Sequence, residues 1–307
     1  ALLRRLAVLG IVLPVLVLGA IAATRYGQIR TETEVRLDRA LRIAREHALK
    51  VVDINETTLA HVMDLLGDTH AGTLRSRESS LHLKLREMTR NKPQIQSLWV
   101  QGSDGRPIAG DRFFPAPPTL NVADRAYFRW HEARRGGLYI SETLVGRATG
   151  TPFVDMSRGR YGPEGDFEGL VSISLLPSYF EDFHRDLAAD EPGLAITMFR
   201  QDGAILTRYP PLANAPPTLS PTSPVMSRIR DGVVAGNAAG ISSVDGRQRL
   251  LTFARVGDYP LYVGTGMDVA EIHRRWRTEM LWLMLIGLPP LIGLFLAARL
   301  ALRRTGE

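Results

Sequence analysis

The sequence predicts an α+β fold between two transmembrane helices, with a long stalk helix followed by two small antiparallel-sheet modules. Three observations predict it. Uncharged apolar spans at Leu6–Ala23 and Met280–Ala298 bracket one long polar segment. The apolar residues of that segment first recur with a period of about 3.6 and then, after Pro93, with a period of two. Helices grouped at the ends of a domain, with strands in runs between them, are typical of the α+β class.

The two apolar spans have the length and composition of membrane helices. They contain 18 and 19 residues without a charged side chain, close to what a helix needs to cross a hydrocarbon core. We predict transmembrane helices over residues 6–24 and 280–298. The alternative for the first span is a signal peptide cleaved at Ala20-Ile21-Ala22, but the amphipathic helix that follows without a break favours a retained anchor.

Basic residues set the expected orientation of the spans. Arg4 and Arg5 precede the first span, and Arg299, Arg303 and Arg304 follow the second. By the positive-inside rule both termini lie in the cytoplasm. Residues 25–279 are then expected on the extracytoplasmic side of the membrane, and residues 299–307 begin a cytoplasmic part.

The charge of the central segment argues against nucleic-acid binding. The chain carries a formal net charge of +6, but without the charged residues outside the two spans 33 basic and 31 acidic residues remain. Nucleic-acid binding needs a clustered basic face, which a net charge of +2 does not indicate. The chain has no cysteine, which excludes disulfides, thiolate catalysis and Cys-ligated zinc.

Residues 27–92 predict two stalk helices. The first covers Gly27–Leu66, and its apolar residues recur close to the helical period at Val35, Leu41, Ala44, Ala48, Val52, Leu59, Val62 and Leu66. The segment Gly67–Gly72 ends it, and a second amphipathic helix follows at Arg75–Arg90. A helix that leaves the membrane in this way is expected to pack on its own domain, on a second copy of the chain, or on both.

Residues 93–190 predict the first sheet module. Its strands are expected at Ile95–Gln101, Arg106–Ala109, Leu138–Val145, Thr151–Ser157 and Gly169–Leu175. Short helices are expected at Asp124–Arg135 and from Pro177 to Ala189, where proline occupies the first turn. In the last strand Val171, Ile173 and Leu175 share one face, and Ser172 and Ser174 share the other.

Residues 191–268 predict the second sheet module. Its strands are expected at Leu194–Phe199, Ala204–Thr207, Ile241–Ser243, Gln248–Ala254 and Leu261–Met267. Aligning the Asp-Gly turns of the two modules sets Trp99-Val100 over Thr197-Met198, which predicts a weak internal repeat. A helix from Asp268 then leads into the second span.

The densest cluster of polar and aromatic side chains lies at Asn121–Ser141. The guanidinium of Arg125 suits a carboxylate or phosphate. Aromatic residues such as Tyr127 and Tyr139 can wall a pocket, and His131 can donate to an anion. The structural alternative is that Asp124 caps a helix, that Arg125 pairs with a nearby aspartate, and that Tyr127 and Phe128 belong to the core.

This cluster resembles part of a known family. Asp124-Arg125-Ala-Tyr127-Phe128, then Leu138-Tyr139-Ile140-Ser141 and Gly169-Leu-Val-Ser-Ile-Ser, are similar to the membrane-distal module of double Cache sensor domains. These are tandem PAS-like extracytoplasmic domains of bacterial histidine kinases, diguanylate cyclases and chemoreceptors. The resemblance covers residues 27–275 and implies a ligand held between the distal sheet and a loop cover.

Carried over position by position, the resemblance implies nine ligand-binding residues. Four lie on the expected cover: Arg125, Tyr127, Phe128 and His131. Five lie on expected strands: Tyr139, Ser141, Asp155, Ser172 and Ser174. Amino-acid-binding members carry Arg-x-Trp-Tyr and an aspartate in the last strand, where this chain has Arg125-Ala-Tyr127-Phe128 and Ser174. The sequence therefore favours a carboxylate or other small anion over an α-amino acid.

The expected function is that of a transmembrane receptor. Ligand binding in the distal module would displace helices at the membrane, within a homodimer, and bias a cytoplasmic histidine kinase or diguanylate cyclase. The sequence holds no hydrolytic motif, and we expect no catalytic residue, metal or cofactor. Two alternatives stay open: a membrane-anchored enzyme, and a module that docks a partner protein through an exposed apolar patch.

Overall fold

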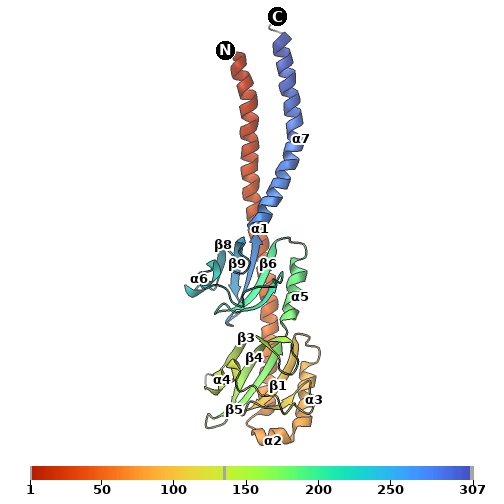
Figure 1. The fold of residues 1–307 in the computed structure, drawn as a ribbon, viewed down its shortest axis with the longest axis vertical. Coiled ribbons are helices and arrows are strands. Elements are labelled where there is room, and N and C mark those ends of the chain that lie inside the picture. Colours follow the sequence, from red (N-terminus) through yellow and green to blue (C-terminus); the bar gives the residue numbers. More distant parts are fainter. Residues whose placement is uncertain (1, 134–135, 305–307) are drawn as a thin grey trace.

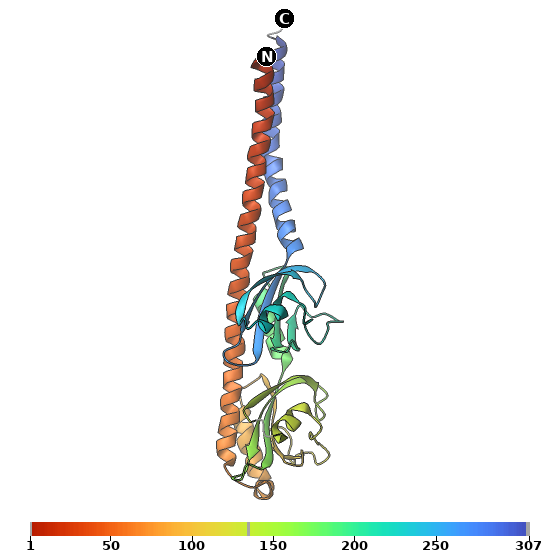
Figure 2. The same ribbon diagram turned by 90° about the vertical axis from the view of Figure 1, so that its left-hand side faces the viewer.

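The computed structural model describes residues 2–133 and 136–304 of the chain. Two long helices occupy one end of an elongated molecule, and two sheet modules follow each other along the first helix (Figure 1). Both termini lie at the helical end. Helix α1 (Leu2–Leu66) passes both modules on the same side (Figure 2), and helix α7 (Val269–Arg304) returns beside its first half.

The outer parts of α1 and α7 carry large apolar side chains on their surface. Leu16 is 63% exposed and Ile286 is 71% exposed. By length and composition, the helices that contain Val12–Leu66 and Val269–Ala297 are apolar enough to cross a membrane. The exposed side chains are those that a hydrocarbon core would cover.

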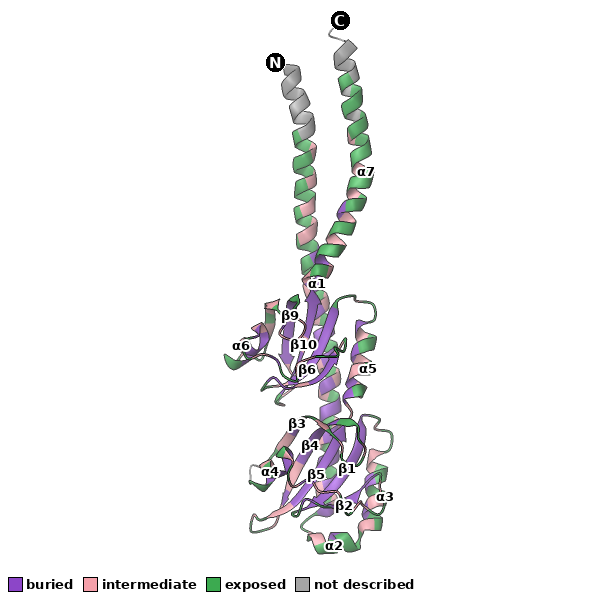
Figure 3. Ribbon diagram, viewed as in Figure 1, coloured by how far each residue is buried: buried purple, intermediate pink, exposed green. Residues whose placement is uncertain are grey.

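The inner part of α1 buries one stripe of side chains against both sheets. The fully or nearly fully buried residues include Ile29, Leu37, Ala44, Ala48, Val52, Leu59, Val62 and Leu66. The alternation of buried and exposed turns is visible along the helix in Figure 3. Val35, which the sequence placed in the stripe, is 54% exposed because the packing face there passes through Thr33 and Leu37.

The distal sheet has the strand order β2-β1-β5-β4-β3, and all neighbours are antiparallel. Its strands are β1 (Ile95–Gly102), β2 (Pro107–Gly110), β3 (Leu138–Val145), β4 (Pro152–Tyr161) and β5 (Phe167–Leu175). Helices α2 (Ala71–Ser76) and α3 (Glu78–Thr89) lie beside β1 and β2, and α4 (Ala126–Glu132) lies over β3, β4 and β5. The single helix expected at Arg75–Arg90 is thus broken at Arg77, whose φ of −108° and ψ of 17° interrupt the helix.

The proximal sheet repeats this architecture with the order β7-β6-β10-β9-β8. Its strands are β6 (Leu194–Arg200), β7 (Ile205–Tyr209), β8 (Ala235–Ile241), β9 (Gln248–Arg255) and β10 (Leu261–Asp268). Helix α5 (Pro177–Ala188) connects the modules, and α6 (Pro224–Arg230) covers the proximal sheet. The two sheets place equivalent strands in equivalent positions, so the predicted α+β class and the internal repeat are both confirmed.

Two proximal elements differ from the expectation. Strand β8 ends at Ile241, where the sequence placed the beginning of a strand at Ile241–Ser243. Helix α6 begins at Pro224, between Thr207 and Ile241, where the sequence predicted neither a helix nor a strand. Its first residue is Pro224, and the Ser223 hydroxyl caps it by accepting a hydrogen bond from the backbone N–H of Met226.

The distal sheet has two chemically different faces. Leu98, Val171 and Ile173 face α1 in the main apolar core of the molecule. The opposite face carries serines and an aspartate that are also buried, because the chain around Leu120–Tyr127 and Gly146–Thr149 folds over it. A buried polar face beneath a loop cover is the setting of the candidate site.

Candidate functional site

The floor of the candidate site is built by strand register. In β1, β5 and β4, Ser97, Ser174 and Asp155 are cross-strand neighbours, and Trp99, Ser172 and Ser157 form the next row. Neighbours in register project from the same face of a sheet. None of these six side chains is more than 6% exposed. Alternate residues of β1 and β4 therefore lie on the same face of the sheet as Ser172 and Ser174.

The cover is held down by charged side chains. Asp124 and Arg147 form an ion pair of 2.5 Å between two parts of the cover loop, and Arg147 also donates to the carbonyl of Asn121. The hydrogen bond and the charge of Arg147 lower the pKa of Asp124 to about 2, so this link is intact at neutral pH. Asp124 pairs with Arg147 and not with Arg125. The Arg125 side chain donates to the carbonyl of Val145 at 2.8 Å and lines a cavity under the cover.

A small cavity lies between floor and cover. Its free volume is about 40 Å³, room for about three water molecules at roughly 10–15 Å³ each. Four predicted site residues line it: Arg125, Tyr127, Ser172 and Ser174. Further lining residues that the sequence did not single out are Gln96, Ser97, Trp99, Gln101, Arg147, Thr149 and Phe153.

Asp155 is the most unusual group on this face. It is 1% exposed, and within the described residues neither of its carboxylate oxygens has a hydrogen-bond partner. Burial raises the pKa of Asp155 to about 7, and the nearby hydroxyls of Ser157 and Ser172 and the charge of Arg125 offset this only in part. A carboxylate that is buried without partners costs stability unless something else pairs with it.

Tyr127 and Gln101 add polar groups to the same chamber. Burial and the nearby charge of Asp155 raise the pKa of Tyr127, so its hydroxyl stays protonated and can donate. The Gln101 side chain is 2% exposed, and its carbonyl oxygen has no hydrogen-bond partner among the described residues. The chamber thus combines a guanidinium, a hydroxyl donor and an amide. The acid, Asp155, lies on the same face of the sheet as the strand neighbour of the lining residue Ser174.

The other predicted site residues lie around the cavity without lining it in this structure. Phe128 packs with Val122 and Leu170 and meets the Phe167 ring edge-on at 5.2 Å between centroids. The Ser141 hydroxyl accepts the backbone N–H of Asp155 at 2.8 Å, which fixes the backbone beside that carboxylate. Both residues support the site through packing and backbone geometry.

His131 and Tyr139 lie on the same side of the sheet as the cover, next to Trp130. His131 is fully buried, and its Nε2 lies 3.2 Å from the hydroxyl of Ser157. Burial lowers the pKa of His131 to about 4, so the ring is neutral at physiological pH. Tyr139 contacts the proximal module, because the guanidinium of Arg200 lies 5.9 Å from the centre of its ring. This pair joins the region of the site to β6.

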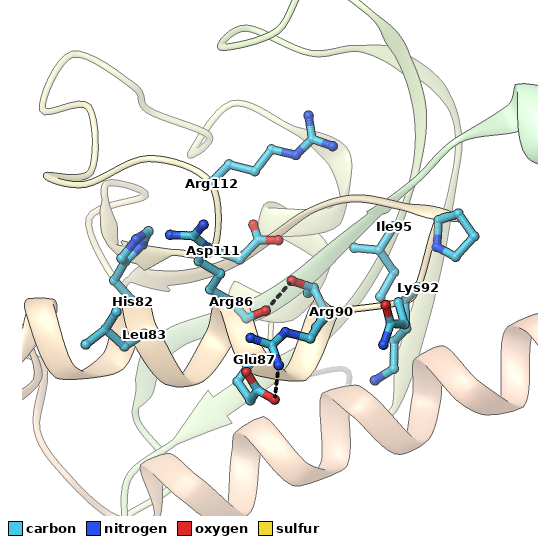
Figure 4. A pocket seen from close by; sticks show the side chains of 12 residues that line it. His82, Leu83, Arg86, Glu87, Arg90, Lys92, Ile95, Asp111 and Arg112 are labelled. Atoms are coloured by element: carbon cyan, nitrogen blue, oxygen red, sulfur yellow. Dashed lines mark hydrogen bonds and ion pairs between the residues drawn. The ribbon is translucent and has the colours of Figure 1, made fainter.

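A larger hollow of about 900 Å³ lies beside α3 and the chain after β2 (Figure 4). Figure 4 shows His82, Arg86, Asp111 and Arg112 around it. Its cations are exposed, and Arg90 already pairs with Glu87 at 3.4 Å. Such a surface is well solvated, whereas the smaller cavity holds buried polar groups without partners, so we take the smaller cavity as the candidate site. In the described part of the chain, no group of three or more histidine, aspartate or glutamate residues is arranged to hold a metal ion.

Comparisons with known proteins show which folds this chain resembles. Residues 177–266 match the family model dCache_1_like, described as a histidine kinase sensor domain. No curated protein sequence matches the chain significantly. The fold is similar to the extracellular domain of the histidine kinase rpHK1S-Z16, with 22% identity over 78% of this chain and 95% of that one, and a TM-score of 0.66.

Two chemoreceptor domains share the same fold. The ligand-binding domain of Campylobacter jejuni Tlp3, solved with L-valine, has 11% identity over 81% of this chain and 97% of that one, with a TM-score of 0.56. The Pseudomonas aeruginosa PAO1 amino acid chemoreceptor PctC, solved with GABA, has 17% identity over 77% of this chain and all of that one, with a TM-score of 0.55.

These findings confirm the resemblance to double Cache sensor domains that the sequence predicted. The matched family model is described as a sensor domain, and the similar structures are the extracellular or ligand-binding domains of receptors. The two apolar helices that flank the sensor domain fit a two-span membrane receptor.

Proposed function

We propose that this chain, whose fold is that of a double Cache sensor domain, binds a small molecule with a carboxylate and an ammonium group. The nine predicted residues surround the proposed site, in the distal module over residues 93–190. The observation that carries the proposal is the buried carboxylate of Asp155, which lacks a partner among the described residues. It is the cross-strand neighbour of Ser174, which lines the same cavity as Arg125. An ammonium group of the ligand would pair with Asp155, and a carboxylate of the ligand would pair with Arg125.

The position of Asp155 changes the argument drawn from Ser174. The sequence disfavoured amino acids because Ser174 replaces an aspartate in the last strand of the module. Asp155 is the cross-strand neighbour of Ser174 and lies on the same face, so a carboxylate is available one strand away. The L-valine and GABA bound to Tlp3 and PctC have the same two charged ends, which supports this class of ligand.

The cover has to move when the ligand enters. A free volume of about 40 Å³ holds only about three water-sized groups, fewer than an amino acid has heavy atoms. The link between Asp124 and Arg147 ties two parts of the cover together, and its exposed ion pair is the weak kind that a loop movement can break. Binding and closure of the cover are therefore coupled in this proposal.

A ligand screen on the complete chain in lipid nanodiscs tests the proposal. GABA, L-valine, butyrate and butylamine are compared by thermal shift, and hits are titrated calorimetrically. We expect compounds with both charged ends to bind best. Arg125→Ala and Asp155→Asn should each weaken their binding at least about 30-fold, since each leaves one ligand charge without its buried partner.

Arg129 is exposed on α4, the helix that begins directly after Arg125. Arg129→Ala is therefore the matched control, and this variant should bind the ligand normally. Equal shifts from butyrate and GABA would remove the role of Asp155 and leave the simple anion site that the sequence favoured. A flat screen would contradict a small-ligand sensor and favour the docking of a partner protein.

The proposed signal leaves the domain through the contact between α1 and α7. Arg25 and Glu279 form an ion pair of 2.6 Å there, and the Trp276 indole donates to the carbonyl of Ala22 at 2.9 Å. Two helices that meet beside the membrane can pass on a small relative displacement. We further propose that the chain acts as a homodimer in the bacterial inner membrane and controls a cytoplasmic histidine kinase or diguanylate cyclase.

A distance measurement tests this transmission. Because the chain has no cysteine, Thr31→Cys and Arg277→Cys allow two spin labels at exposed positions of α1 and α7. Saturating ligand is expected to change the distance between the labels by about 1–2 Å. The same pair in the Asp155→Asn background should not respond. A ligand that binds the native chain without changing this distance would contradict transmission through these helices.

A further inference from the structure

The proximal module contains a second cavity in the place that corresponds to the distal one. One side of this cavity is the face of β6, β10 and β9 that points away from α1. The other side is a cover formed by α6 and the chain around Ser242. Its free volume is about 60 Å³. By strand register, Thr197 and Gly264 of this sheet correspond to Trp99 and Ser172 of the distal sheet.

The charge on this second floor is the reverse of the distal one. Leu251, the neighbour of Gly266, takes the position that Asp155 has beside Ser174. Instead of a carboxylate, two arginines line the cavity, Arg208 from β7 and Arg249 from β9. Their side chains are only 7% and 5% exposed.

One aspartate serves both arginines. The Oδ2 atom of Asp245 accepts from Arg208 and from Arg249, each at 2.8 Å. Burial would raise the pKa of Asp245, but hydrogen bonds from Arg249 and Ser242 and the two guanidinium charges hold it at about 2. Asp245 is therefore ionised, and it neutralises only one of the two cations.

The remaining charge belongs chiefly to Arg208. Arg249 also donates to the carbonyls of Gly193 and Gly266, so its N–H groups have acceptors besides Asp245. Arg208 donates to Thr197 at 3.2 Å, but its buried Nε–H has no partner among the described residues. Asp268, the strand neighbour of Arg249, already pairs with Arg247 at 2.9 Å. A buried cation in excess is costly unless an anion accompanies it.

Glycines of the central strand provide the space. A Cβ atom at Gly264 would lie 3.4 Å from the ring of Phe199, and one at Gly266 would lie 2.8 Å from Leu251. The space is bordered by the hydroxyl residues Thr197, Ser223, Ser242 and Ser243. These groups can donate to an anion that Arg208 holds.

We propose that the proximal module binds a small carboxylate anion in this cavity, held by Arg208 and the surrounding hydroxyls. The volume fits about four heavy atoms at roughly 10–15 Å³ each, which is the size of acetate. The site is independent of the distal one, and it makes the sensor responsive to two chemically different molecules. An anion that binds only the folded module also stabilises it.

Acetate is the probe for the test. The complete chain in nanodiscs is titrated with sodium acetate and with sodium chloride at equal ionic strength, and the melting temperature is recorded. We expect acetate to raise the melting temperature of the native chain and of Arg125→Ala, which lacks the distal arginine. Arg208→Gln should lose the shift and weaken acetate binding roughly tenfold or more. Arg230→Gln, exposed on α6, is the matched control.

Gly264→Ala is a second variant that keeps all charges. Its methyl group would occupy the floor at ordinary contact distances, so the module should fold while the acetate shift disappears. This variant decides the test if Arg208→Gln fails to fold. The proposal is overturned if acetate has no effect on the native chain, or if its effect survives Gly264→Ala. It is also overturned if Arg125→Ala alone removes the effect, because acetate would then bind the distal site.

Discussion

Replacing Asp155 by asparagine is expected to stabilise the unliganded chain at pH 8 by up to about 4 kcal/mol, while abolishing the binding of ligands with an ammonium group. The pKa of Asp155 in the folded chain is about 7, above the ordinary value of 3.8. The contribution of Asp155 to the free energy of unfolding is therefore fully present below pH 4, and it is lost as the pH rises to about 7. Asparagine carries no charge, so it removes that loss.

Urea unfolding at pH 5 and pH 8 measures the effect. The gain from Asp155→Asn should be small at pH 5 and largest at pH 8, and Asp64→Asn, on the exposed face of α1, should change neither value. An Asp155→Asn chain that is less stable than the native one at pH 8 would mean that the carboxylate already has a partner. A gain in stability with a loss of binding is what a site that was selected for function, and not for stability, should give.

His184 is expected to make the junction between the modules sensitive to acid. The ring is fully buried on α5, and neither nitrogen has a hydrogen-bond partner in the described part of the chain. Burial, with a smaller contribution from the charge of His47, lowers the pKa of His184 to about 4. The stability that His184 contributes is therefore complete above pH 6.5 and is lost as the pH falls toward 4, by up to about 3 kcal/mol.

The variant His184→Phe keeps an aromatic ring and removes the titration. Its unfolding free energy should exceed that of the native chain by about 2 kcal/mol more at pH 4.5 than at pH 7. His61→Gln, exposed on α1, should leave the profile unchanged. Over part of this pH range Asp155 changes the unfolding free energy in the opposite direction. The effect of His184 is therefore read from the difference between the variant and the native chain, and not from the native pH profile alone. Parallel profiles for His184→Phe and the native chain would contradict the assignment.

The sequence predicted the elements whose signals are local. Strand β3 has the expected bounds, Leu138–Val145, because it is rich in apolar and β-branched residues and Gly137 and Gly146 flank it. Strand β8 was misplaced because Ala235–Ile241 consists mainly of glycine and alanine, whose low strand propensity hides a strand that pairing with β9 stabilises. Helix α6 did carry a local signal, the Ser223-Pro224 start, within a proline-rich segment that argued against it.

The candidate site was partly visible for the same reason. Arg125 and Tyr127 were singled out by the local cluster of polar and aromatic residues. Ser172 and Ser174 were added by the resemblance to a family, and alternation within one strand placed them on one face. The meaning of Asp155 depends on which residue of β5 lies beside it, and pairing register is a long-range property that one sequence does not reveal. The partner of Asp124 was likewise Arg147, 23 residues away, and not its neighbour Arg125.

The continuity of α1 restricts how this architecture can diverge. From Arg25 to Leu66 the helix extends about 60 Å at 1.5 Å per residue, and both modules pack on its buried stripe. One inserted residue between the two packing regions would rotate the distal half by about 100° and turn its stripe away from the sheet. Loops such as Pro115–Pro118 are free to change in length, but a taller molecule would have to grow by about seven residues, two helical turns, at a time.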